Sequence, residues 1–221
     1  MDNSINPISN DYLCSVLLTR IQWEGHRVKY ISADPNERDI GKLRNIALDA
    51  DDCKCGIRID DDGYCDAEYL EKLYHACEAS TGFGAVGGLV PPMASEKLWT
   101  KPETYINKID EFYDLQGEGD QCYFRNQTQP MEADHLRSSF MYYNEVAKKF
   151  RHPECYGKTG YREETDLTYR MKLAGLKLLV VPDAICWHIM APIGGGRDER
   201  VDIRADNIHK FKQRMKECSS Q

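Results

Sequence analysis

The 221-residue sequence has no apolar run that approaches the ~20 residues a helix needs to cross a membrane. Its N-terminus lacks the basic and then apolar pattern of a secretory signal peptide. Positive charge is not in excess either: 29 Lys and Arg residues stand against 36 Asp and Glu, for a formal net charge of −7. These absences predict a cytoplasmic protein with no transmembrane segment, and they argue against nucleic acid as a partner.

Paired Cys-x-x-Cys spacing is also missing, although the chain has nine cysteines. The closest two, Cys53 and Cys55, are one residue apart, and no second pair accompanies them. Structural zinc sites usually show two such pairs, so the sequence does not predict one. We interpret the cysteines as reduced thiols, several of them simply buried.

The apolar periodicity alternates between helix and strand. Helices are predicted over residues 12–23, from residue 40 to about 50, over 70–77, 145–150 and 163–174, and over about 202–218. Strands are predicted over 28–31, 57–59, 84–90, 139–143 and 178–181, with a turn at 182–183 and a short return over 185–188. This order predicts one α/β domain whose central sheet is mostly parallel and flanked by helices, with ligands beyond the carboxyl ends of the strands.

Three adjacent carboxylates, Asp60, Asp61 and Asp62, follow the predicted strand at 57–59 and stop at Gly63. Side chains alternate along an extended backbone, so Asp60 and Asp62 point the same way. Oxygen ligands in this pattern suit Mg²⁺ or Mn²⁺, which often share them with substrate phosphates. A solvated acidic turn is the alternative. An EF-hand calcium loop is excluded, because Tyr69 stands where that motif requires Glu.

The run Gly41-Lys-Leu-Arg-Asn-Ile-Ala-Leu, followed by Ile57-Arg-Ile-Asp-Asp-Asp, resembles family 2 glycosyltransferases of GT-A fold. The second half agrees with this. Arg162-Glu-Glu-Thr-Asp-Leu-Thr-Tyr-Arg is similar to the family's Glu-Asp-x-Asp-Leu-x-x-Arg helix, and Val181-Pro-Asp-Ala-Ile-Cys-Trp-His is similar to its closing Pro-x-Ala-x-x-x-His. The likeness covers roughly residues 28–200.

The resemblance implies a single GT-A-type, Rossmann-like domain over residues 1–221. Its nucleotide-sugar half would span about 1–92, its acceptor and catalytic half about 93–200, and a C-terminal helix about 202–218. The family opens with a strand before its first helix, and no clear strand precedes Tyr12. We therefore expect the first unit to be shortened at the N-terminus.

The resemblance also implies a donor site. Asp60 and Asp61 would lie at the nucleotide sugar, Asp62 together with Asp60 would hold the divalent metal, and Arg44 would lie near the phosphates. His188 matches the family's closing histidine, which helps to hold the metal or the diphosphate. An ordinary solvated cation is the alternative for Arg44, and a packed histidine beside Trp187 is the alternative for His188.

Two further features complete the predicted site. Glu164 falls where the family has its catalytic base, and Glu163 beside it leaves open which of the two acts; a helix-capping carboxylate is the alternative. The loop from Gly194 to Gly196 could let Arg197 close over the diphosphate, or it could be a plain connector. Asp166 and Arg170, four residues apart on the predicted helix 163–174, are expected to form a structural ion pair.

The resulting prediction is a transferase that depends on Mn²⁺ or Mg²⁺. It would move a sugar from a nucleoside diphosphate sugar, UDP-sugar first, to a hydroxyl of a carbohydrate-type acceptor such as a glycan, a lipid or a protein glycan. A single base opposite the leaving group favours inversion. A degenerate domain that binds without turnover stays an alternative. A sugar-phosphate nucleotidyltransferase would need a glycine-rich phosphate loop near the N-terminus, which residues 1–25 lack.

Overall fold

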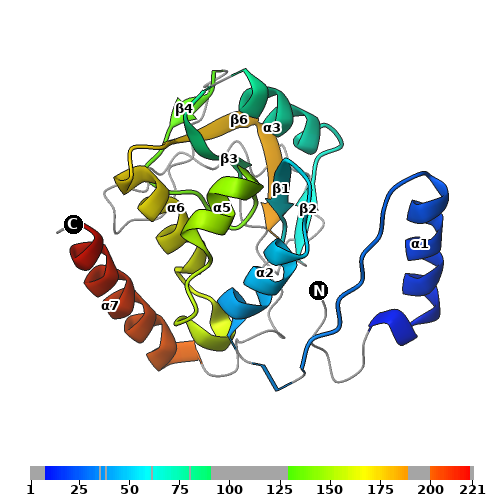
Figure 1. Cartoon of the computed structure of the whole chain (residues 1–221), viewed down its shortest axis with the longest axis horizontal. Coiled ribbons are helices and arrows are strands. Elements are labelled where there is room, and N and C mark those ends of the chain that lie inside the picture. The colour runs from blue at the N-terminus through cyan, green and yellow to red at the C-terminus, as the bar shows by residue number, and fades with distance from the viewer. Residues whose placement is uncertain are drawn as a thin grey trace.

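The computed structural model describes residues 8–34, 36–37, 39–60, 62–79, 81–90, 129–188 and 200–219. These residues form an α/β unit in which a curled mixed sheet is flanked by helices (Figure 1). The predicted α/β class is therefore confirmed.

The sheet is mixed rather than mostly parallel. Its described strands are β1 (Cys55–Arg58), β2 (Gly63–Cys65), β3 (Phe83–Leu89), β4 (Met131–Glu132), β5 (Phe140–Tyr143) and β6 (Lys177–His188). They run in the order β1-β5-β3-β6-β2, with β4 also on β6, and of these pairings β3–β6 alone is parallel. The prediction was wrong because β5 lies between β1 and β3 and pairs antiparallel with both. The order of elements along the chain does not reveal such an insertion.

Strand β6 connects the core of the sheet to β2, the strand that follows Asp60 and Asp62. Its first part pairs with β3, and its last three residues pair antiparallel with β2. The sequence predicted a strand, a turn and a separate return, but Lys177–His188 is one bent strand. The bend falls where the β3 register shifts between Gly88 and Leu89. A Cβ on Gly88 would lie 2.1 Å from the Ala184 oxygen, so a larger residue would clash with the β6 backbone at this bend.

Six described α-helices accompany the sheet: α1 (Tyr12–Trp23), α2 (Ile40–Asp49), α3 (Tyr69–Glu78), α5 (Asn144–Phe150), α6 (Glu163–Leu173) and α7 (Arg200–Ser219). All six were predicted within a few residues. Helix α3 covers one face of the sheet, and α2, α5 and α6 pack on the other (Figure 1). Successive side chains of β5 point to opposite faces of the sheet: Phe140 and Tyr142 pack toward α6, and Met141 packs toward α3.

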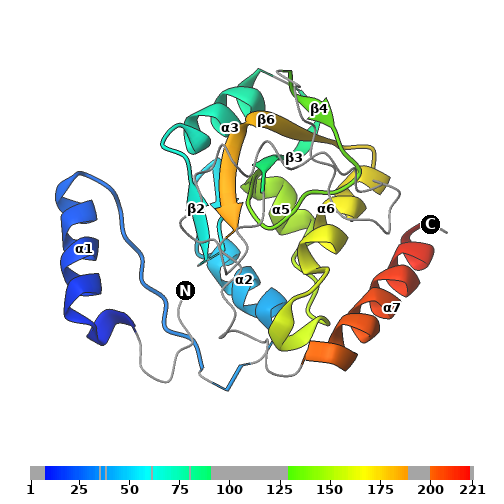
Figure 2. The same ribbon diagram turned by 180° about the vertical axis from the view of Figure 1, so that it is seen from behind.

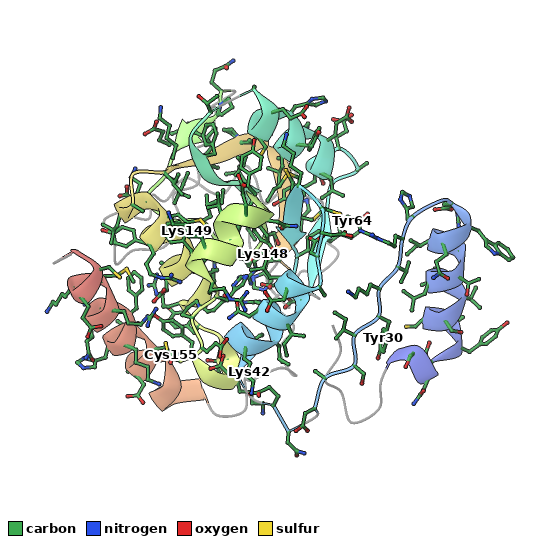
Figure 3. All side chains as sticks on the ribbon, in the orientation of Figure 1. Tyr30, Lys42, Tyr64, Lys148, Lys149 and Cys155 are labelled. Carbon is green, nitrogen blue, oxygen red and sulfur yellow. The ribbon has the colours of Figure 1, made fainter. Side chains whose placement is uncertain are left out.

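Helix α1 stands apart from the sheet and its helices in both views (Figures 1 and 2). None of its residues is buried, and Trp23 is 86% exposed. The strand predicted over 28–31 is not present; that stretch has no regular structure, and Ser32 forms a single bridge. Tyr30, labelled in Figure 3, lies on this segment. Of the helices the structure describes, none combines the length and the apolarity needed to cross a membrane.

The buried carboxylate of Asp166, on α6, binds a side chain of α7. The Asp166 side chain is fully buried and accepts hydrogen bonds from Arg170 Nε and Arg214 Nε, each at 2.6 Å, and from the Tyr156 hydroxyl at 2.9 Å. The predicted Asp166–Arg170 ion pair is therefore confirmed. Asp166 serves the fold by joining α7 to the helix on which Glu163 and Glu164 lie.

Candidate metal and donor site

The acidic run forms a tight turn between β1 and β2. The Gly63 amide donates to the Asp60 carbonyl oxygen at 2.9 Å, which closes the turn directly after β1. A Cβ on Gly63 would lie 3.0 Å from that carbonyl oxygen, so the absence of a side chain lets the turn close tightly. Asp60 and Asp62 are both described, whereas Asp61 lies outside the described residues.

The fold brings Asp60, Asp62 and His188 together; we call these three residues the acid–histidine cluster. Antiparallel pairing places His188, the last residue of β6, opposite Gly63. Its Nε2 atom lies 3.1 Å from Asp62 Oδ1. One potential ligand atom from each of the three residues lies within 4.8 Å of the others, and all three side chains are partly buried. The residues were selected from sequence motifs about 125 positions apart, and the strand register makes them neighbours.

The donor set of this cluster suits a divalent cation. Carboxylate oxygens suit Mg²⁺ and Mn²⁺, whereas an imidazole nitrogen is a ligand of divalent transition metals, so the mixed set fits Mn²⁺ better than Mg²⁺. His188 also carries a buried Nδ1 atom with no hydrogen-bond partner among the described residues, although its Nε2 is engaged by Asp62. A buried polar atom without a partner costs free energy unless a ligand or solvent satisfies it.

Two arginines contact the Asp60 carboxylate. Asp60 Oδ1 accepts from Arg58 Nη2 at 2.8 Å and lies 3.3 Å from Arg44 Nη2. Burial of Asp60 opposes ionisation, but the positive charges of Arg58 and Arg44 outweigh it and hold the pKa of Asp60 below its usual value. Burial, and next the charge of Arg58, lowers the pKa of Arg44 to about 10, so Arg44 stays protonated at neutral pH. Asp60 is therefore an ionised carboxylate at neutral pH.

The two glutamates at the start of α6 have different surroundings. Glu163 is fully buried, and its carboxylate contacts Arg44, Arg58 and His152. Glu164 is partly exposed, and its carboxylate has no hydrogen bond or ion pair with another described residue. It lies close enough to Arg44 to favour the charged form of that side chain. The Glu163 carboxylate is therefore enclosed by its partners in the buried network, whereas Glu164 is partly open to solvent.

Sequence reasoning missed Arg58 and His152. Arg58 stands between Ile57 and Ile59, and it shares a strand face with Asp60 by the period-two rule. That spacing was the available signal, since a charged residue within a short apolar strand needs a partner. Nothing in the sequence linked His152 to Glu163. The predicted residue Arg197, with its glycine loop, lies outside the described residues.

Buried His152 makes the stability of the protein sensitive to mild acid. Burial, and next the charges of Arg58 and Arg44, lowers the pKa of His152 to about 2, so the folded protein holds it neutral. The unfolded chain protonates it below about pH 6.5. Stability from this residue is thus complete above that pH, and we expect it to fall by about 1.4 kcal/mol per pH unit as the pH drops further.

Urea unfolding at pH 7, 6 and 5 measures this loss. His152→Gln should remove most of that slope. His75→Gln is the control. The His75 side chain is 69% exposed, so its substitution should leave the slope unchanged. Equal slopes in the wild type and in His152→Gln would contradict a neutral buried histidine.

The fold is of the GT-A type, as a comparison with solved structures shows. A solved structure described as GalNAc-T7 with UDP, GalNAc and Mn²⁺ superimposes with a TM-score of 0.65 at 12% sequence identity. The match covers 94% of this chain and 40% of that one, so the chain spans about two fifths of the length of the neighbour. No protein-family model and no curated protein matches the sequence. The likeness therefore shows the fold.

Proposed function

We propose that this chain is a metal-dependent glycosyltransferase that takes its sugar from a nucleoside diphosphate donor, with UDP-sugars the first candidates. The observation that carries the proposal is the convergence of Asp60, Asp62 and His188 on a GT-A fold. The structural neighbour was solved with UDP, GalNAc and Mn²⁺, which supports this class of donor and metal. The motif order along the chain favours a relationship with family 2 glycosyltransferases.

Residues of the cluster would hold the cation. Asp62 and His188 present an oxygen and a nitrogen 3.1 Å apart, and Asp60 adds a carboxylate that the arginines keep ionised. A bound Mn²⁺ or Mg²⁺ would neutralise charge on the diphosphate leaving group. Arg44 is 21% exposed at its side chain and lies at the same edge, so it can add positive charge near that group.

Glu164 would act as the general base. It is the second residue of α6 and follows Glu163, whose carboxylate contacts the same two arginines as Asp60, so this helix end adjoins the acidic turn. A partly exposed carboxylate can accept the proton of the acceptor hydroxyl while that oxygen attacks the anomeric carbon. With one base and no second nucleophile assigned, the proposed outcome is inversion. The acceptor is a carbohydrate-type hydroxyl.

Calorimetric titration with UDP, GDP and ADP, each with and without Mn²⁺, tests the proposal, followed by a donor-hydrolysis assay with UDP-sugars. We expect one nucleoside diphosphate to bind in a Mn²⁺-dependent manner and the matching sugar nucleotide to be hydrolysed slowly. Binding without turnover of any donor would favour a degenerate binding domain. No metal-dependent binding of any of the three would contradict the proposed function.

Asp62→Asn is expected to weaken Mn²⁺-dependent nucleotide binding by about 10-fold or more, because the amide lacks the anionic oxygen that a hard cation prefers. Calorimetry measures the affinity, and the thermal midpoint checks the fold. Asp183→Asn is the matched control, since that carboxylate is exposed and pairs only with Lys72 among the described residues. Unchanged affinity in Asp62→Asn would remove Asp62 from the metal site.

A further inference from the structure

Two cysteines face each other where β2 pairs with β6. Cys65 on β2 lies directly opposite Cys186 on β6, and their Sγ atoms are 3.0 Å apart. Both are free thiols; Cys186 is fully buried, and Cys65 is partly exposed. They are 121 residues apart in sequence, so the chain positions them only through its fold.

The strand register brings the two thiols to a position that can accept a disulfide. The Asp66 amide donates to the Ile185 oxygen at 3.0 Å, which makes that pair a hydrogen-bonded one. Hydrogen-bonded and non-hydrogen-bonded pairs alternate along antiparallel strands, so Cys65 and Cys186 form a non-hydrogen-bonded pair. Side chains approach most closely there, with Cα atoms about 4.5 Å apart, within the range that disulfides span. A bond of about 2.05 Å needs the sulfurs to move about 1 Å closer.

The thiol pair lies next to the acid–histidine cluster. Side chains alternate between the two faces of a strand pair, so Gly63 and His188 lie on the same face of the β2–β6 pair as Cys65 and Cys186. A Cβ on Gly63 would be 3.3 Å from Cys186 Sγ, so this sulfur packs against the turn that carries Asp60 and Asp62. Within the described sheet, β2 is an edge strand that pairs with β6 alone. The pairing that holds Asp62 near His188 is thus only three residues long.

We propose that Cys65 and Cys186 are a redox-sensitive pair whose disulfide clamps β2 to β6 and thereby holds Asp62 and His188 in position to bind a cation. The disulfide itself follows from the strand pairing. Its effect on cation binding rests on the proposed function. Fixing two ligands in the arrangement that they already have lowers the ordering cost of binding, so the oxidised form should bind the cation more tightly.

The oxidant is a small-molecule or protein disulfide. The more exposed Cys65 sulfur attacks one sulfur of the oxidant, which releases one thiol and leaves a mixed disulfide. Cys186 then attacks the Cys65 sulfur and releases the second thiol. Two protein thiols are oxidised, one external disulfide is reduced to two thiols, and their two protons pass to those products. Burial, and next the contact with Cys186, raises the pKa of Cys65 to about 12, so we expect oxidation at neutral pH to take hours.

The first test incubates the full chain with glutathione disulfide. We expect the mass to fall by two hydrogens and peptide mapping to show a Cys65–Cys186 crosslink. The thermal midpoint should rise by about 5 °C or more, because the bond closes a long loop in the unfolded chain, and dithiothreitol should reverse both changes. Cys65→Ala should abolish the crosslink, whereas Cys53→Ser, at an exposed thiol, should retain it. Cys55 and Cys77 lie in the same core cluster as the pair, and a crosslink between those two instead would overturn the proposal, as would no crosslink.

The second test titrates Mn²⁺ alone into the oxidised and reduced forms by calorimetry. We expect the oxidised form to bind about threefold more tightly or better, and Cys65→Ala to show no change on oxidation. Equal or weaker affinity of the oxidised wild type would overturn the clamp while leaving the disulfide in place. Absence of Mn²⁺ binding in both forms would overturn the clamp, whereas the nucleotide titrations with and without Mn²⁺ decide the proposed function. The crosslink and the thermal shift do not depend on activity, so they separate the two failures.

Discussion

Glu164→Gln is expected to lower sugar transfer by about 100-fold or more while donor affinity and thermal midpoint stay close to those of the wild type. Glutamine keeps the size of the side chain, but it cannot accept a proton at neutral pH, and loss of a general base usually has this magnitude. The fold should tolerate the change, because the Glu164 carboxylate makes no hydrogen bond or ion pair with another described residue. Single-turnover transfer assays measure the rate, and calorimetry measures donor binding.

Glu145→Gln is the matched control for this experiment. Glu145 is also a glutamate in the first turn of a helix, α5, but it is exposed and has no role in the proposed site. Its substitution should leave transfer unchanged. If Glu164→Gln retains transfer, the base lies elsewhere; if donor binding falls together with the rate, Glu164 binds the donor and is not the base.

Local pattern predicted the elements of this fold better than it predicted their pairing. Helix α6 was readable because its apolar residues Leu167 and Met171 recur at helical spacing, and both are fully buried. The position of β5 between β1 and β3 depends on contacts between residues far apart in sequence, such as Gly56 with Tyr142 and Ala85 with Tyr142. Periodicity contains no information on such contacts. The stretch 28–31 has strand-like residues but pairs with no described strand, and propensity alone does not make a strand.

The candidate site was also predictable only in part. Alternation put Asp60 and Asp62 on one side of the chain, and the motif order suggested His188; the structure places the three together. Only the structure distinguishes Glu163 from Glu164, because adjacent residues at a helix start are equivalent in pattern and differ in burial. The partners of Glu163 come from α2, β1 and the segment after α5, and such a convergence is visible only after folding.

Glu163→Gln is expected to produce the opposite signature: a loss of about 3 kcal/mol or more in the free energy of unfolding. In the folded protein the positive charges of Arg44 and Arg58 are balanced by Glu163 and Asp60. Glutamine removes one of the two negative charges and leaves a buried arginine uncompensated. The glutamine amide also offers one oxygen acceptor where the carboxylate offers two, and that oxygen is uncharged, so the hydrogen bonds to the arginines would be weaker.

Thermal and urea unfolding measure this effect, and Glu164→Gln is its matched control, with the same substitution one residue away. A loss of this size lowers the thermal midpoint of a chain of this length by about 6 °C or more. Residual transfer, measured well below the new midpoint, should fall less than in Glu164→Gln, because the base is intact. If Glu163→Gln is as stable as the wild type and loses transfer instead, Glu163 is the base. The buried network then serves to tune that carboxylate and not to hold the fold together.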